Sequence, residues 1–181
     1  VVRGGDEGAV AQVWPLVVDS PAWRDLLDRI GRRDEPFVQR LFERELSRAL
    51  RLDAGDRGGD EQAEQLDTLR LHLAARGDRA ALAALVANAP SRSAPFLRRC
   101  RQRVPSVSAE QAAALLTAAF VGDDPEQASE LLEWAASSQP AGTTDALWEF
   151  WQNPPADNPM VEELCATVAR LLLAGTRRDD L

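Results

Sequence analysis

Apolar side chains recur at the 3.6-residue period of an α-helix along most of this chain, while the alternating pattern of a β-strand is nearly absent. The periodic segments also carry helix start and stop signals. Ser108 with Gln111 three residues later is a capping box, and Gly122 follows the last apolar position of the same segment. The pattern predicts an all-α fold, an irregular bundle of about eight or nine short helices arranged as antiparallel hairpins.

A polar, glycine-rich break suggests how the chain is divided. Residues 53–60 read Asp-Ala-Gly-Asp-Arg-Gly-Gly-Asp, which is typical of a hinge. We therefore expect residues 1–60 to form an N-terminal helical hairpin with a flexible lead, and residues 61–181 to form a helical-hairpin bundle. We expect one compact domain overall, and a start at Val1 without Met suggests that the chain is excised from a larger protein.

Two stretches of the sequence resemble each other. Residues 69–89 and 116–136 each read as helix, Gly-Asp, helix, with the Gly-Asp turns 45 positions apart. The spacing resembles that of HEAT and armadillo repeats, and the hairpins resemble the helix pairs of tetratricopeptide and HEAT proteins. The aromatic and small-residue positions that mark tetratricopeptides are missing. Two interpretations stay open: a short helical-repeat-like stack, or unrelated hairpins that share a glycine C-cap.

Composition excludes several chemistries. The chain has no Lys and no Tyr, and its single His is His72, which we expect to face solvent or to cap a contact. Cys100, Cys165 and His72 lack the paired spacing of a structural zinc site, so we expect both cysteines to be small core residues. No phosphate loop, nucleophile elbow or His-Glu-x-x-His motif is present. We therefore expect no catalytic residue, no cofactor and no metal.

The distribution of charge along the chain is the strongest remaining signal. Residues 1–60 carry 12 acidic residues and 10 Arg, residues 61–108 carry 4 and 8, and residues 109–181 carry 13 and 3. The 66 positions between Arg103 and Arg170 contain no basic residue. The last third of the chain is therefore expected to present a negative field. Helical carboxylate pairs, such as Glu130 with Glu133, are expected on solvated faces.

Positive charge is concentrated in one short segment, which contains Arg98, Arg99, Arg101 and Arg103. Clustered Arg is able to bind phosphate or nucleic acid, but a sequence pI near 4.8 argues against direct nucleic-acid binding. We favour a contact between this cluster and acidic side chains, either within the fold or across an interface.

Three aromatic residues, Trp148, Phe150 and Trp151, stand on a predicted short helix over residues 146–152, and Trp134 lies upstream. Leu147 and Trp151 share a helix face, so Trp148 and Trp151 are not expected to be buried through one contact. Two interpretations stay open. Both indoles are core side chains, or one is an exposed anchor in an acidic rim, the usual composition of an interface hot spot.

These observations predict a non-enzymatic protein–protein interaction or adaptor module of a bacterial multidomain protein. The expected partner is another protein or a second copy of this chain. The alternatives are a helical sensor domain for a small ligand and an accessory module of a bacterial defence or signalling system. No apolar run reaches the ~20 residues of a membrane span, so we expect a cytoplasmic protein. The predicted partner-binding residues are Trp148, Glu149, Trp151, Trp134, Glu133, Arg98, Arg99 and Arg101.

Overall fold

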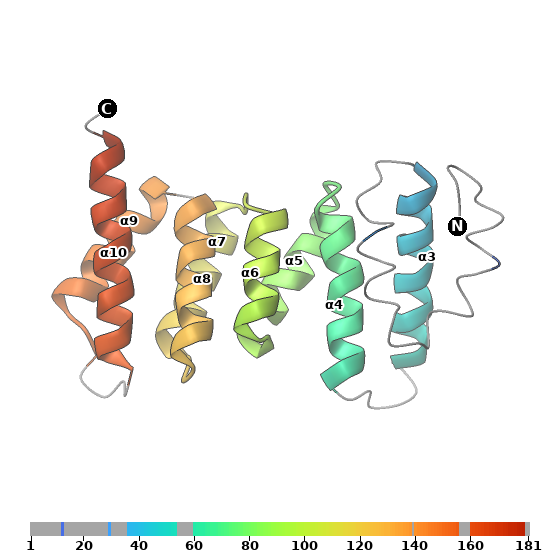
Figure 1. Cartoon of the computed structure of the whole chain (residues 1–181), viewed down its shortest axis with the longest axis horizontal. Helices are drawn as coiled ribbons and strands as arrows, with labels where there is room; N and C mark the ends of the chain where they lie inside the picture. Colours follow the sequence, from blue (N-terminus) through green and yellow to red (C-terminus); the bar gives the residue numbers. More distant parts are fainter. Residues whose placement is uncertain are drawn as a thin grey trace. The chain divides into compact units, whose positions relative to one another are not determined.

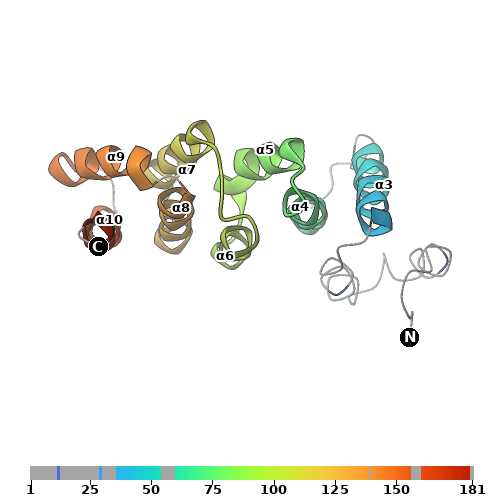
Figure 2. The same ribbon diagram turned by 90° about the horizontal axis from the view of Figure 1, so that it is seen from above.

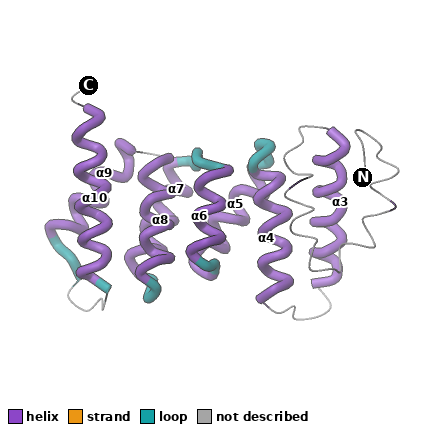
Figure 3. Tube along the Cα trace, viewed as in Figure 1, coloured by secondary structure: helices purple, strands orange, loops and turns teal. Residues whose placement is uncertain are grey.

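The computed structural model describes residues 36–53, 60–138, 140–155 and 160–179, together with Gln12 and Arg29. Within these ranges every regular element is a helix (Figure 1, Figure 3), which confirms the predicted all-α fold. The predicted lead and first helix, and residues 54–59 of the glycine-rich break, lie outside the described residues. The chain divides into two compact units, Val1–Asp78 and Arg79–Leu181, called unit 1 and unit 2 below. The boundary expected at residue 60 stays a prediction.

In unit 1, helix α3 (Pro36–Asp53) packs against helix α4 (Asp60–Ala74). The sequence left two options for His72, to face solvent or to cap a contact. The side chain does not face solvent, because it is almost fully buried in unit 1. Its ring stacks on Phe42 of α3 with 4.8 Å between the ring centroids. The guanidinium of Arg76 lies 5.2 Å from the same Phe42 ring. An aromatic contact between the helices, which sequence periodicity does not reveal, is the reason for this burial.

Unit 2 contains six α-helices and one short 3₁₀ helix among its described residues. In chain order they are α5 (Arg79–Asn88), η1 (Ala89–Ser91), α6 (Ala94–Arg103), α7 (Ala109–Val121), α8 (Pro125–Ser138), α9 (Pro140–Gln152) and α10 (Val161–Asp179). The chain alternates between two layers, with α6, α8 and α10 in one and α5, α7 and α9 in the other (Figure 2). Each layer therefore juxtaposes helices that are separated in sequence.

Helix α8 is the centre of unit 2, because it contacts α6, α7, α9 and α10. Its inward stripe is apolar and fully or nearly fully buried, made of Ala128, Leu131, Leu132, Trp134 and Ala135. Cys100 of α6 is also buried, as expected, whereas Cys165 of α10 is half-buried, and both are free thiols. Because this stripe faces the core, the polar contacts of α8 are made by the opposite face of the helix.

The predicted start of α7 is confirmed in detail. The Ser108 hydroxyl accepts a hydrogen bond from the Gln111 backbone at 3.2 Å, and the Gln111 side chain accepts one from the Ser108 backbone at 2.9 Å. The two Gly-Asp turns, however, do not share a C-cap. Gly77 has a φ of 93°, where only glycine is unstrained, whereas Gly122 has a φ of −64°. The two hairpins therefore do not share a glycine C-cap, and the choice between a short repeat-like stack and unrelated hairpins stays open.

Two helices run through a glycine. Helix α9, predicted over residues 146–152, begins at Pro140 and includes Gly142. Thr143 lies inside this helix and is buried. Helix α10 continues through Gly175 to Asp179. A glycine costs a helix only about 1 kcal/mol, so a single glycine does not end either helix.

Candidate interaction surface

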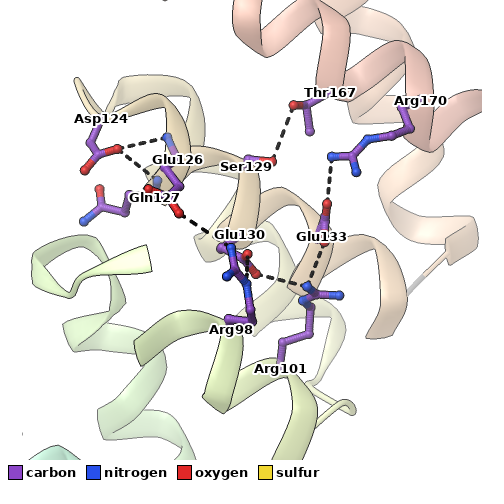
Figure 4. A network of polar contacts seen from close by, with 10 residues as sticks. All are labelled: Arg98, Arg101, Asp124, Glu126, Gln127, Ser129, Glu130, Glu133, Thr167 and Arg170. Carbon is purple, nitrogen blue, oxygen red and sulfur yellow. Dashed lines mark hydrogen bonds and ion pairs between the residues drawn. The ribbon is translucent and has the colours of Figure 1, made fainter. Parts of the chain in front are cut away.

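The arginines of α6 face acidic side chains of α8 (Figure 4). Nε of Arg98 donates a hydrogen bond to Oε1 of Glu130 at 2.7 Å, and Nη2 of Arg101 lies 3.1 Å from Oε2 of the same carboxylate. Glu130 retains only 5% of its exposed area. A buried carboxylate is stable only when it is paired, and here each of its oxygens has its own guanidinium.

The same contacts continue across the layer to α10 (Figure 4). Nη2 of Arg101 lies 2.8 Å from Oε2 of Glu133, and Nη2 of Arg170 lies 2.7 Å from Oε1 of Glu133. The alternating series Arg98, Glu130, Arg101, Glu133, Arg170 is called the ion-pair ladder below. The hydrogen bond to Glu130, followed by its charge, raises the pKa of the Arg98 guanidinium above its ordinary value. The ladder therefore links α6, α8 and α10 through permanent cations.

The ladder shows how the structure uses the arginine cluster. Arg98 and Arg101 make contacts within unit 2, and Arg99 lies over the ring of Phe96 with its guanidinium 5.4 Å from the centroid. The expectation that Glu130 lies on a solvated face is wrong. The acids of α8 at positions 126, 130 and 133 follow helical spacing, and so do the arginines at 98 and 101, but the sequence does not say that these two faces meet.

Trp134, which the sequence grouped with the partner-binding residues, is fully buried in the core of unit 2. Its indole Nε1 donates a hydrogen bond of 2.8 Å to the carbonyl of Val104, at the end of α6. A partner that docks on the surface does not reach this side chain. We therefore correct its assignment from a partner contact to a core residue.

Trp148 and Trp151 are different, because each keeps 43% of its area exposed. Helix α9 is held instead by Leu147 and Phe150, which are buried. Phe150 stacks on Phe120 of α7 with a centroid distance of 4.4 Å. Since these two side chains supply the apolar contact of the helix, both indoles remain at the surface.

The two exposed indoles share a face of α9, because positions three apart on a helix differ by only about 60° in direction. The position of each Trp relative to Leu147 does not reveal this shared face. Asp145 and Glu149 of the same helix are also exposed. Around the helix axis Asp145 lies about 60° from Trp148, whereas Glu149 lies about 100° from Trp148 and about 160° from Trp151. Asp145 lies three residues before Trp148 and is the residue that sequence reasoning missed; its i, i+3 spacing from Trp148 was the available signal. We call Asp145, Trp148, Glu149 and Trp151 the α9 face.

The α9 face offers apolar rings and negative charge side by side. In the part of the chain that the structure describes, neither carboxylate forms an ion pair and no guanidinium lies over either indole. The described residues also contain no group of three or more His, Cys, Asp and Glu side chains that could hold a metal ion. None of the described helices combines the length and hydropathy needed to cross a bilayer. Comparisons with models of known families, with curated proteins and with solved structures find no match to this chain.

Proposed function

We propose that this chain is a non-enzymatic protein–protein interaction module that docks a partner on the α9 face. The observation that carries the proposal is the pair of half-exposed indoles, Trp148 and Trp151, on one side of one helix. Large aromatic side chains that stay in water are costly for a folded chain, and Trp is the residue most enriched at the energetic centres of interfaces.

The rest of unit 2 supports this role by holding α9 rigid. Leu147 and Phe150 anchor the helix to its neighbours, and α9 contacts α7, α8 and α10. An aromatic anchor on a rigid helix loses little conformational entropy on binding, which favours affinity. The charged ladder lies between α6, α8 and α10, and we assign it to the stability of unit 2 rather than to the partner.

The experiment that tests this proposal is site-specific photo-crosslinking. A benzophenone amino acid is placed at Glu149 on the α9 face or, as a matched control, at Glu110 of α7, which is also an exposed acidic residue. Both proteins are irradiated in an extract of the cells that produce the chain. We expect a discrete protein adduct from position 149, no such adduct from position 110, and loss of the adduct when Trp148 and Trp151 are replaced by Ala.

Helicity measured by circular dichroism controls for folding of the Trp variant, because both side chains are exposed and their removal should leave the helices intact. The same adduct from positions 149 and 110, or an adduct unchanged by the Trp substitutions, would refute the proposal.

A further inference from the structure

We infer that the α9 face binds an arginine-rich segment of a different protein chain. This inference rests on the proposed function and adds the chemistry of the partner. It predicts that one guanidinium of the partner stacks on Trp148 while it pairs with Asp145, and that a second guanidinium stacks on Trp151.

The charge of the surface points to a cationic partner. Asp145 and Glu149 are exposed and, among the described residues, form no ion pair. The sequence supplies no basic residue from position 104 to position 169, so α9 has no cation of its own or close to it in the chain. Two exposed carboxylates on the same helix as two exposed indoles attract cations and repel phosphate-bearing ligands.

The spacing of the four residues suits a guanidinium in particular. Asp145 and Trp148 are three residues apart, which places their Cβ atoms about 5–6 Å from each other on a helix. A cation over an indole lies within about 6 Å of the ring centroid. One guanidinium therefore reaches the Trp148 ring and the Asp145 carboxylate together, and Glu149, four residues after Asp145, borders the same position.

Arg fits this arrangement better than Lys because its planar guanidinium stacks on a ring and presents N–H donors along its edge. An ammonium is a compact and strongly hydrated charge without a plane to stack. The chain itself uses this contact elsewhere, since Arg76 lies 5.2 Å from the Phe42 ring and Arg99 lies 5.4 Å from the Phe96 ring. In both cases a guanidinium and an aromatic ring meet within the fold.

A second copy of the chain is the less favoured occupant. Its densest arginine cluster is on α6, where Arg98 and Arg101 pair with Glu130 and Glu133 and Arg99 lies over Phe96. To donate these cations to α9 of another copy, unit 2 would have to break the ion-pair ladder and leave the buried Glu130 carboxylate without partners. We therefore assign the α9 face to a separate chain.

The test measures binding of a fluorescein-labelled peptide of alternating Arg and Gly to the full chain by fluorescence anisotropy, with the Lys-Gly peptide in parallel. We expect the Arg-Gly peptide to bind more tightly than the Lys-Gly peptide. The Trp148→Ala/Trp151→Ala variant should weaken binding of the Arg-Gly peptide about tenfold, because each cation–π contact at a partly exposed site contributes a several-fold factor. Trp148→Gln/Trp151→Gln gives a second variant should the Ala variant fold poorly.

Two matched charge variants distinguish peptide binding at the α9 face from nonspecific attraction of the peptide by the negative charge of the chain. The first variant removes the two exposed carboxylates of α9, by Asp145→Asn and Glu149→Gln. The second removes two exposed carboxylates on other helices, by Glu43→Gln and Glu110→Gln. We expect a several-fold loss of Arg-Gly binding in the first variant and little change in the second. Equal losses in both, equal binding of the two peptides, or unchanged binding by the Trp variant would overturn the inference.

The outcomes also distinguish this inference from the proposed function. When position 149 crosslinks to a protein but the Arg-Gly peptide neither binds nor competes with that adduct, the inference fails and the proposed function stands. When the adduct from position 149 is a second copy of the chain, the separate partner is refuted. When neither peptide binding nor an adduct is found, both are refuted.

Discussion

Replacement of both Arg98 and Arg101 by Ala should destabilise unit 2 strongly, because it removes both cations that face Glu130. The Glu130 carboxylate is 5% exposed and is paired at 2.7 Å and 3.1 Å. Leaving a buried charge without partners costs about 3–5 kcal/mol. Each single substitution leaves one guanidinium in place, and Arg98 is itself half-exposed, so we expect a smaller loss of stability for Arg98→Ala than for the double substitution. The double substitution should therefore cost more than either single change.

A third substitution sharpens this prediction. Glu130→Leu in the background of the double variant removes the unpaired charge and fills its place with apolar atoms, and such replacements of a whole buried ion set are often close to neutral. We expect the triple variant to recover about 2 kcal/mol or more relative to the double variant. Arg99→Ala on the same helix is the control, with an expected cost of about 0.5–1 kcal/mol from its contact with Phe96.

The assay is urea denaturation at pH 7 and moderate salt, followed by Trp fluorescence and far-UV circular dichroism. The free energy of unfolding and the slope with urea are compared among the variants. A triple variant as unstable as the double variant would refute the reasoning that desolvation of Glu130 sets the cost. A double variant no less stable than Arg99→Ala would show that the ladder does not stabilise the fold.

Two further predictions concern the core and the turns. Trp134→Phe should lower the free energy of unfolding by about 2 kcal/mol, because it removes buried volume and leaves the Val104 carbonyl without the indole N–H that donates to it at 2.8 Å. An unchanged midpoint in urea denaturation would contradict this prediction. Gly77→Ala should destabilise the fold by about 1–2 kcal/mol, because a residue with a Cβ is strained at the φ of 93° found there. Gly142→Ala inside α9 should stabilise the fold by about 0.5–1 kcal/mol, because an added Cβ meets no atom within 4 Å. Thermal melts of the two glycine variants should shift in opposite directions, and a shift of both in one direction would count against the assigned backbone conformations.

The fold class was predictable from the sequence because helix signals are local. Ser108 and Gln111 cap α7 through hydrogen bonds between residues three apart in the chain. The start of α9 was not predictable in the same way. The aromatic segment predicted a helix over residues 146–152, whereas α9 begins at Pro140 and passes through Gly142, because a single glycine costs a helix only about 1 kcal/mol.

The candidate site was predictable only in part. The sequence supplied Trp148, Glu149 and Trp151 as residues of one short helix, and it anticipated that the arginine cluster contacts acids. It did not show that Glu130 is buried, because this depends on α6 and α8 lying side by side. Nor did it separate Trp134 from the other indoles, since the carbonyl of Val104 that accepts its N–H lies 30 residues away in the chain.

The central claim is that Trp148 and Trp151 bind arginine from a partner while Trp134 serves the core. The most direct measurement is the set of indole N–H signals in a ¹⁵N-labelled full chain, which has five Trp, assigned by single Trp→Phe variants and titrated with the Arg-Gly peptide. The account predicts saturable shifts of the Trp148 and Trp151 signals and an unmoved Trp134 signal. Saturable binding of the peptide with the Trp148 and Trp151 signals unchanged would contradict it.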